Sequence, residues 1–151
     1  MQTARLFKHW DEVRAGLIEA LEKLDHRQLD FVPGPGLWSL KETVCHIAET
    51  ERGWFRYAVA RQLGSWEEAE ISPGDFSSLD TLKSLLKAVH SDTEAMFQPD
   101  PDAFNASKVR LPWGAKVTVE DVVWHVIEHE IHHRGEIYLM LGMQGIEAPD
   151  V

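Results

Sequence analysis

Four of the eight histidines of this chain fall within nine residues near its C-terminal end, in the stretch HVIEHEIHH. On a helix that turns about 100° per residue, His125, His129 and His133 lie within roughly 40° of one direction. Glu136 shares that direction, and His132 lies roughly 60° to one side. Imidazoles on an apolar helix need polar partners once they leave water, and a metal ion is one such partner. The spacing therefore predicts a metal site or a buried hydrogen-bond network.

Two histidines four residues apart on a helix can bind one ion, but most divalent metal sites use at least three protein ligands. His46 is the candidate for the third ligand, because it lies at the edge of the apolar face of an expected second helix. Helical bundles build internal metal sites from facing helices in this way. Taken alone, His129 and His133 also fit an ordinary hydrogen-bonded pair, and His46 alone fits an ordinary polar residue. The metal interpretation depends on the three coming together.

The pentapeptide HEIHH, residues 129–133, also matches the H-E-x-x-H pattern of metalloproteases, with Glu130 as the general base. The overlapping HVIEH, residues 125–129, matches the inverted pattern, so a segment rich in His and Glu satisfies both by composition. The longer metzincin pattern fails, because Glu136 and Leu139 stand where glycine and histidine are needed. A zincin also needs strands to hold a peptide, and little strand is predicted. We therefore reject a protease.

Apolar residues recur at steps of three and four over most of the chain, which is typical of amphipathic helices. Four long helices are predicted, at about 3–24, 39–63 (stopping at Gly64), 79–96 and 118–141 (stopping at Gly142). Ser39 and Glu42 form a capping box at the start of the second helix, and Thr118 can cap the fourth. The stretch VRLPWGAKVTV predicts a small hairpin or an extended loop before the last helix.

These elements predict an all-α protein, a four-helix bundle formed by a single domain over residues 1–151. The last predicted helix is apolar on nearly all sides, so it is expected to be the most buried helix or to carry a partner interface, and we expect a homodimer. Tryptophans that could line a pocket are Trp38, Trp54, Trp113 and Trp124. Histidines expected to be solvated or near helix ends are His9, His26 and His90.

The chain carries 15 Lys and Arg against 25 Asp and Glu, with a formal net charge of −10. This charge repels phosphate backbones and anionic lipids, so neither nucleic acid nor a membrane is an expected partner. No segment resembles a secretory signal or a membrane span, and we therefore expect a cytoplasmic protein. The single cysteine, Cys45, fits a reducing compartment. It lies about 100° from His46 around the helix, which favours a packed thiol over a ligand.

Two motifs resemble those of the DinB-like, or YfiT-like, metalloenzyme family. The stretch WSLKETVCHIAETE resembles the first, Trp-Ser followed by a helix that carries a histidine, here His46. The stretch HVIEHEIHHRGEIYLMLGMQGIEAP resembles the second, H-x-x-x-H-R-G-[QE] followed by a leucine-rich turn and a Gly-Ile ending. The order and spacing of the two motifs cover most of the chain. The resemblance implies a four-helix bundle in which His46, His129 and His133 bind a metal.

The resemblance also implies roles for the neighbours of these ligands. His125 and Glu136 are expected to support the ligands without binding the ion, and His132 is expected to flank the site. Glu136 stands where the family usually has glutamine, which adds negative charge near the metal. Arg134 is expected at the surface or paired with a carboxylate. No catalytic side chain is implied, because the reacting group would be a metal-bound water or thiolate.

Three neutral imidazoles leave a divalent ion with open positions, whereas four protein ligands normally close a structural zinc site. The family resembles thiol S-transferases that use a small cellular thiol, thiol-dependent isomerases and metal-dependent hydrolases. The resemblance therefore implies a metal-dependent enzyme for a small-molecule substrate, with transfer involving a low-molecular-weight thiol favoured over hydrolysis. A non-catalytic metal-binding protein of the stress response is a further alternative. Zinc, nickel, iron and manganese all fit imidazole ligands.

Overall fold

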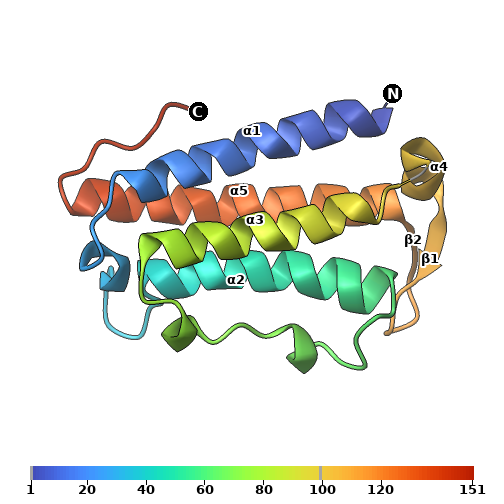
Figure 1. Ribbon diagram of the computed structural model, residues 1–151, viewed down its shortest axis with the longest axis horizontal. Helices are drawn as coiled ribbons and strands as arrows, with labels where there is room; N and C mark the ends of the chain where they lie inside the picture. The colour runs from blue at the N-terminus through green and yellow to red at the C-terminus, as the bar shows by residue number, and fades with distance from the viewer. Residues whose placement is uncertain (1, 99) are drawn as a thin grey trace.

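The computed structural model describes residues 2–98 and 100–151, and its long helices pack side by side as a bundle (Figure 1). The long helices are α1 (Gln2–Glu22), α2 (Leu40–Arg52), α3 (Leu79–Ala95) and α5 (Val119–Met143). The shorter elements are η1 (Gln28–Asp30), η2 (Gly53–Val59), η3 (Glu67–Ala69), η4 (Pro73–Asp75), α4 (Pro101–Ala106), β1 (Lys108–Arg110) and β2 (Lys116–Thr118). The predicted four-helix bundle is confirmed. No helix within the described ranges combines the length and apolarity needed to cross a membrane.

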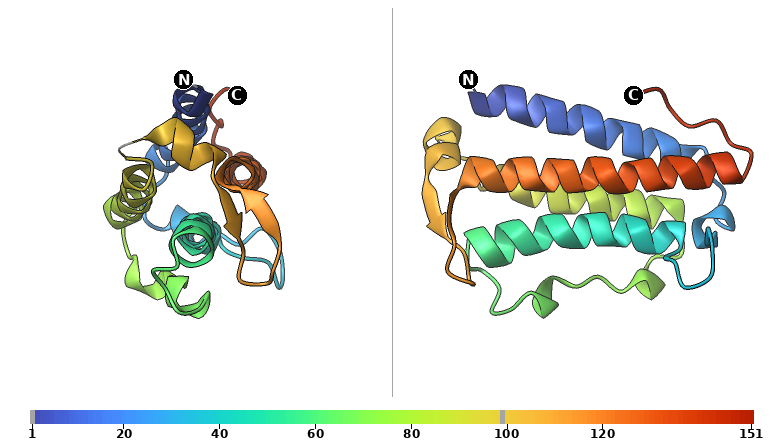
Figure 2. Two further views of the ribbon diagram at one scale, coloured as in Figure 1. Left: turned by 90° about the vertical axis from the view of Figure 1, so that its right-hand side faces the viewer. Right: turned by 180° about the vertical axis from the view of Figure 1, so that it is seen from behind.

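The first two helices of the bundle, α1 and α2, lie diagonally opposite each other and not side by side. The helices α1 and α5 run in one direction, and α2 and α3 run in the other (Figure 1). Seen end-on, α1 lies opposite α2, and α3 lies opposite α5 (Figure 2). Both α1 and α2 therefore pack against α3 and α5. Residues 60–78 run back along the outside of the bundle to reach the start of α3 (Figure 1). This topology makes α2 and α5 neighbours, and these helices carry the predicted ligands.

The starts of the helices that carry the ligands are set by capping boxes. At the start of α2, the Ser39 hydroxyl accepts from the Glu42 amide at 3.1 Å, and the Glu42 carboxylate accepts from the Ser39 amide at 2.6 Å. Thr118 and Asp121 form the same reciprocal pair at the start of α5. Both predicted caps are confirmed. Each satisfies amide groups that a helix start leaves without partners.

The α-helical part of α2 ends earlier than the sequence predicts. It ends at Arg52, and the chain continues as the π-helix η2, in which the Ala60 amide donates to the Phe55 carbonyl at 2.8 Å. Arg61 then takes a left-handed φ of 56°, three residues before the predicted stop. A Cβ at Gly53 would lie 2.7 Å from the Trp66 ring, so glycine lets this indole pack on the backbone. Apolar spacing does not reveal such a local contact.

The last helix runs one residue past the predicted stop at Gly142. It ends at Met143, and the residue with left-handed φ is Gly145, at 74°. The Ile146 amide donates to the Leu141 carbonyl at 2.9 Å across this turn. The sequence offers two glycines in this region, and the second is the one that takes the left-handed conformation of a helix end.

The segment between α3 and α5 contains a helix that the sequence analysis missed. Pro101 occupies the first turn of α4, where a missing amide donor costs nothing, and Asp100 caps it by accepting from the Ala103 amide at 3.1 Å. Of the two predicted alternatives for the next segment, the small hairpin is present. Strands β1 and β2 pair antiparallel, with Val109 opposite Val117.

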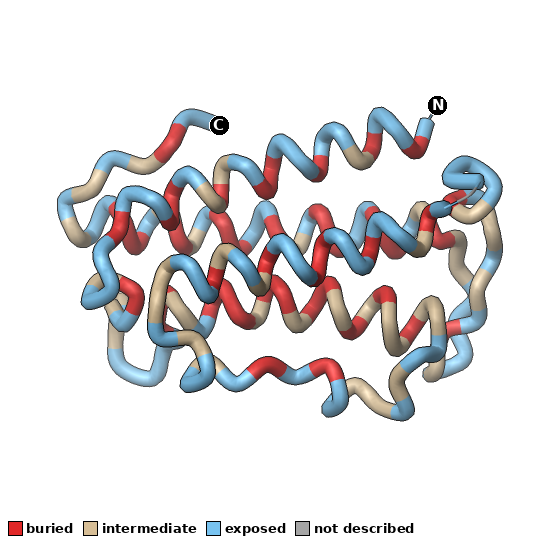
Figure 3. The backbone as a smooth tube through the Cα atoms, viewed as in Figure 1, coloured by how far each residue is buried: buried red, intermediate tan, exposed pale blue. Residues whose placement is uncertain are grey.

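Buried residues follow the inner faces of the helices (Figure 3). The apolar ones form two clusters. One cluster includes Leu17 of α1 and Ile137 of α5. The other includes Trp10 of α1, Phe55 of η2 and Ile127 of α5. Between these two sets, each of the four long helices contributes a polar side chain.

These polar side chains form a buried layer, hereafter the polar layer, of Arg14, Glu51, His90 and Glu130. The Arg14 guanidinium donates to Glu130 Oε1 at 2.6 Å and to Glu51 Oε2 at 2.7 Å. The Trp10 indole donates to Glu130 Oε2 at 2.7 Å, and His90 Nδ1 lies 2.9 Å from Glu51 Oε1. The prediction of a solvated or terminal position for His90 is wrong. The layer joins all four long helices.

The charges of the polar layer stabilise one another. Burial opposes ionisation of Glu51, but Arg14 and His90 outweigh it and lower the pKa of this carboxyl. Burial also opposes protonation of His90, but the hydrogen bond to Glu51 and its charge raise the pKa of the imidazole. In the same way, the two carboxylates raise the pKa of Arg14 against the effect of burial. The contacts within the layer therefore favour the charged forms of Arg14, Glu51 and His90 against the effect of burial.

Removing one carboxylate of the polar layer should leave buried donors without their acceptor. We expect Glu130→Ala to lower the free energy of unfolding by about 3–5 kcal/mol, because Arg14 would lose its bidentate partner inside the bundle. Glu128→Ala, at an exposed position of the same helix, is the matched control and should change stability by less than about 0.5 kcal/mol. Urea denaturation measures both. Equal stabilities for the two variants would contradict this account of the layer.

The lowered pKa of Glu51 also predicts a pH dependence. Its contribution to stability is present above the ordinary pKa of 4.5 and is lost as the pH falls through the lower folded pKa, because the unfolded chain binds the proton first. Below pH 4.5 the free energy of unfolding should therefore fall more steeply for the wild type than for Glu51→Gln. Urea denaturation at a series of pH values tests this. Parallel pH profiles for the two proteins would show that Glu51 is not stabilised as an anion.

Candidate metal centre

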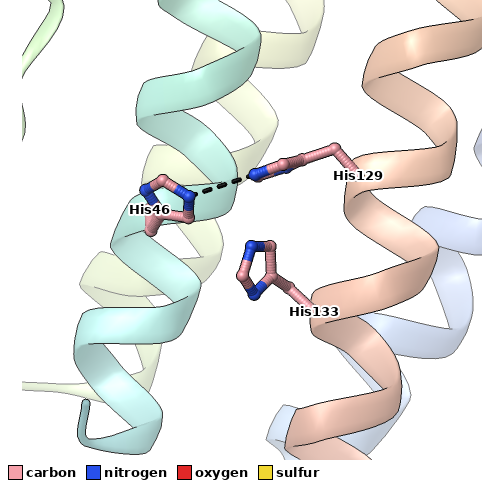
Figure 4. Close-up of side chains that lie close together, drawn as sticks. All are labelled: His46, His129 and His133. Carbon is pink, nitrogen blue, oxygen red and sulfur yellow. Dashed lines mark hydrogen bonds between the residues drawn. The ribbon is translucent and has the colours of Figure 1, made fainter. Parts of the chain in front are cut away.

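The structure brings His46, His129 and His133 together in the groove between α2 and α5. His46 lies near the middle of α2, and the other two lie one turn apart on α5, with the three rings turned toward one another (Figure 4). His129 Nε2 is 3.0 Å from His46 Nε2, and one ring nitrogen from each histidine lies within 4.8 Å of the others. Ring nitrogens that share a tetrahedral zinc ion lie roughly 3.3 Å apart, so the donor set fits a single divalent ion.

The protonation of these histidines also suits a metal. Burial, followed by the charges of His133 and His46, lowers the pKa of His129 to about 3. Burial and the charge of His133 likewise lower the pKa of His46. Both rings are therefore neutral near pH 7 and offer lone pairs. Metal ligands must be deprotonated before they bind, so this environment removes a cost of metal binding.

Glu136 holds the third histidine in position. Its Oε2 lies 2.7 Å from His133 Nδ1, which leaves His133 Nε2 as the nitrogen available to an ion. Its Oε1 lies 3.1 Å from Nε2 of His132, a ring that is 68% exposed. A carboxylate that accepts from the second nitrogen of a ligand histidine fixes the ring and its tautomer. Glu136 and His132 thus lie where a supporting and a flanking residue were expected.

His125 lies one turn before His129 on α5, and its ring packs edge-on against Trp54 with the centroids 4.8 Å apart. Within residues 2–98 and 100–151, the groups of side chains that could hold a metal do not include it. It contributes to the low pKa of His129 through its charge, as a lesser cause than the two neighbouring ligand candidates. A supporting role for His125 stays a prediction.

Three other residues of the two motifs face away from the groove. Glu130 belongs to the polar layer, which removes it from the position of a general base and agrees with the rejection of a protease. Arg134 is buried, donates to the Val13 carbonyl at 3.3 Å and lies over the Tyr138 ring, so its predicted surface or carboxylate-paired position is wrong. Cys45 is buried in the apolar core, as predicted, and burial raises the pKa of its thiol to about 11.

A pocket of about 360 Å³ opens beside the histidine cluster, and His133 is the member of the cluster that lines it. Its lining consists of Pro33, Gly36, Leu37, Trp38, Thr43, His133, Glu136, Leu139 and Met140. The ring of Trp38 lies 4.7 Å from the ring of His46 and 6.2 Å from that of His133, measured between centroids. Trp38 was among the predicted pocket residues. Leu139 and Met140 were missed, although they follow Glu136 by three and four residues and so share its side of the helix.

A larger hollow, of about 950 Å³, lies between the starts of α1 and α5. Its lining includes Leu6, His9 and Trp124 but none of the three clustered histidines. Another group of possible metal ligands consists of Asp11, His90 and Glu94. Both of its carboxylates are exposed, and its histidine already pairs with Glu51 of the polar layer. The smaller pocket has a member of the histidine cluster in its lining and the larger hollow has none, so the smaller pocket is the candidate site.

Known proteins share both the sequence and the fold of this chain. YizA, an uncharacterized protein from Bacillus subtilis, is 27% identical over 104 residues, which are 68% of this chain and 62% of YizA. The chain therefore matches somewhat less than two thirds of the length of that relative.

Among solved structures, a DinB-like protein from Bacillus cereus superimposes with a TM-score of 0.78 at 18% identity, over 97% of this chain and 95% of the other. YfiT from Bacillus subtilis, described as a probable metal-dependent hydrolase with an unusual four-helix bundle topology, gives 0.73 at 19% identity, over 97% and 89%. A mycothiol-dependent maleylpyruvate isomerase gives 0.59 at 15% identity, over 87% and 60%. These likenesses establish the fold.

The sequence model of the DinB family matches residues 1–151, the full length of this chain. The chain belongs to the DinB family.

Proposed function

We propose that this protein is a metal-dependent enzyme in which His46, His129 and His133 bind one divalent cation. The observation that carries the proposal is the convergence of three ring nitrogens, within 4.8 Å of one another, from two neighbouring helices. Three protein ligands leave room for a substrate atom, as in catalytic zinc sites. The neighbouring pocket of about 360 Å³ supplies space for the rest of a small molecule.

When bound, a divalent ion lowers the pKa of a coordinated water or thiol, so that a nucleophile is available near neutral pH. The residues of the chain prepare the site for this chemistry. Glu136 holds the proton on His133 Nδ1 and so directs Nε2 toward the other two histidines. Burial keeps His46 and His129 unprotonated. The Trp38 ring packs against the His46 ring, with 4.7 Å between the centroids, and so adds an apolar contact beside the site.

Among the possible reactions, we favour transfer that uses a low-molecular-weight thiol. The pocket has mainly apolar walls, and the Thr43 hydroxyl already donates to the Ser39 carbonyl at 2.9 Å. Few donors are left to orient the polar groups of a hydrolysed bond, whereas a thiolate needs only the ion. The mycothiol dependence of the similar isomerase supports this choice. The description of YfiT as a probable metal-dependent hydrolase supports hydrolysis of a small substrate as the second candidate.

The ion itself is zinc, nickel, iron or manganese, since imidazole ligands suit all four. We place the enzyme in the cytoplasm, where small thiols are kept reduced. A non-catalytic metal-binding protein would have the same ligands without turnover, so metal binding and catalysis need separate tests.

Protein purified without a histidine tag should contain one metal ion per chain. We expect His46→Ala and His129→Ala each to weaken metal affinity by more than about 100-fold, because even a partner of a ligand contributes 10–100-fold. His26→Ala, an exposed histidine outside the cluster, is the matched control and should keep its metal. Elemental analysis and competition with a chelator measure the affinities. A folded wild type that cannot be loaded with any of the four metals would refute the metal site.

Turnover should depend on the ion and on a thiol together. We expect the metal-loaded protein to conjugate a small thiol to an electrophile, and we expect chelation or His129→Ala to abolish the reaction. Product analysis by mass spectrometry follows both the thiol reaction and the hydrolysis of activated esters and amides. Hydrolysis without thiol transfer would favour the second candidate function, and metal binding without either reaction would favour a binding protein.

We also propose that the outer face of α5 forms a homodimer. Trp124 and Ile131 are 44% and 38% exposed on this face, seven residues apart. Gly135 and Gly142 continue the same line with no neighbouring atom within 4 Å of an added Cβ, so a second helix can approach closely. The exposed apolar stripe supports association with a second copy.

Ile131→Asp should place a charge in this interface and convert the dimer to a monomer. Ala88→Asp, at an exposed position of α3, is the control and should leave the dimer intact. Analytical ultracentrifugation measures the mass of both variants. A wild type that sediments as a monomer at micromolar concentration would refute the dimer.

A further inference from the structure

We propose that the pocket beside the three histidines selects uncharged or cationic, largely apolar thiols and rejects thiols that carry a carboxylate or a phosphate. This selection rests on the proposed metal-dependent function and concerns the organic part of the thiol that occupies the pocket. It follows from the charges and contacts of the lining residues.

The pocket offers an apolar surface to its occupant. Leu37, Trp38, Leu139 and Met140 form its walls, together with Pro33. Leu139 is 65% exposed and stands at the rim, so a guest would remove apolar surface from water on entering. Among the nine lining residues there is no lysine or arginine. An anionic guest would therefore lose its hydration without meeting a cationic side chain in the lining.

The basic residues nearest in sequence to the lining are engaged elsewhere. Lys41 forms an ion pair with Asp30 at 3.1 Å. Arg134 follows His133 directly, but its guanidinium reaches the Val13 carbonyl of α1, inside the bundle. Neither is in position to receive a carboxylate in the pocket.

The charged side chain that does line the pocket is a carboxylate. Glu136 is 43% exposed, and its two oxygens contact the imidazoles of His132 and His133. Carboxylate oxygens have further lone pairs that can accept from an ammonium or a hydroxyl group of a guest. Glu49, one helical turn from His46, adds a second negative charge near the site and accepts from the Ile71 amide at 3.1 Å.

The net charge of the site with an ion and a thiol bound also favours uncharged or cationic thiols. A divalent ion with three neutral imidazoles carries two positive charges, and Glu136 supplies one negative charge beside it. A thiol that bound as thiolate would release its proton to solvent, and the ion, the imidazoles, Glu136 and the thiolate together would carry no net charge, with Glu49 as a further negative charge nearby. Any additional carboxylate on the guest would give the site a net negative charge and lie close to Glu136, where repulsion is weakly screened.

Three benzyl mercaptans that differ in the para substituent test this selection. The substituents are aminomethyl, hydroxymethyl and carboxyl, which are cationic, neutral and anionic and lie too far from the sulfur to chelate the ion. Protein loaded with cobalt(II) reports binding through the absorption band of the cobalt–thiolate bond. We expect the cationic and neutral thiols to bind at least about tenfold more tightly than the anionic one.

Two variants and a matched control separate charge selection from other effects. Glu136→Gln should narrow the difference between the neutral and anionic thiols severalfold, whereas Glu128→Gln, at an exposed position of the same helix, should not change it. Leu139→Lys, at the exposed rim, should reverse the preference toward the anionic thiol. Cobalt content is measured in every sample.

The outcomes are distinguishable. A chain that takes up neither cobalt nor zinc, nickel, iron or manganese would overturn both the proposed function and the selection. Uptake of cobalt with equal affinity for the three thiols, or a preference that Glu136→Gln and Leu139→Lys leave unchanged, would overturn the selection alone.

Discussion

The buried ion pair between Arg14 and Glu130 is the interaction on which the rest of the structure depends. It joins α1 to α5, and the contacts of Arg14 and His90 with Glu51 extend it to α2 and α3. Buried charges require close, well-oriented partners, so the layer tolerates few alternative alignments of the helices. It thereby sets the level at which α2 and α5 face each other. That alignment, more than local helix propensity, determines which histidines meet in the groove.

The helix α5 contributes to both the histidine cluster and the polar layer, and it does so through adjacent residues. His129 and Glu130 are about 100° apart around the helix, so one faces the groove toward α2 and the other faces Arg14 in the interior. Their order explains why this segment resembles a protease motif without being one. The diagonal topology matters equally, because it brings together residues 46 and 129 through neighbouring helices. A sequential up-and-down arrangement would instead place α2 beside α1.

Much of this arrangement could be predicted from sequence, and the failures have physical causes. Spacing of apolar residues and capping boxes located the long helices, and the histidine motifs indicated which side chains to bring together. The π-helix and the contact of Gly53 with Trp66 depend on tertiary packing that spacing does not encode. The polar layer had a visible signal, however: Arg14 lies four residues after Trp10 and three before Leu17, within the apolar stripe of α1. A charged residue in such a stripe requires a buried partner.

The carboxylates Glu51, Glu130 and Glu136 differ in the partners that balance their negative charge. This difference supports the position of the proposed metal site. Glu51 and Glu130 are buried and share the Arg14 guanidinium, and Glu51 also contacts His90, so both carboxylates have partners within the bundle whether or not anything is bound. Glu136 is paired only with imidazoles, of which His133 is needed by the ion as a neutral ligand. The fold therefore places a carboxylate without a guanidinium or ammonium partner beside the groove where the ring nitrogens of His46, His129 and His133 converge. The proposed divalent cation would satisfy the nitrogens and the carboxylate together, and the apolar pocket next to it would then limit the charge of the proposed guest.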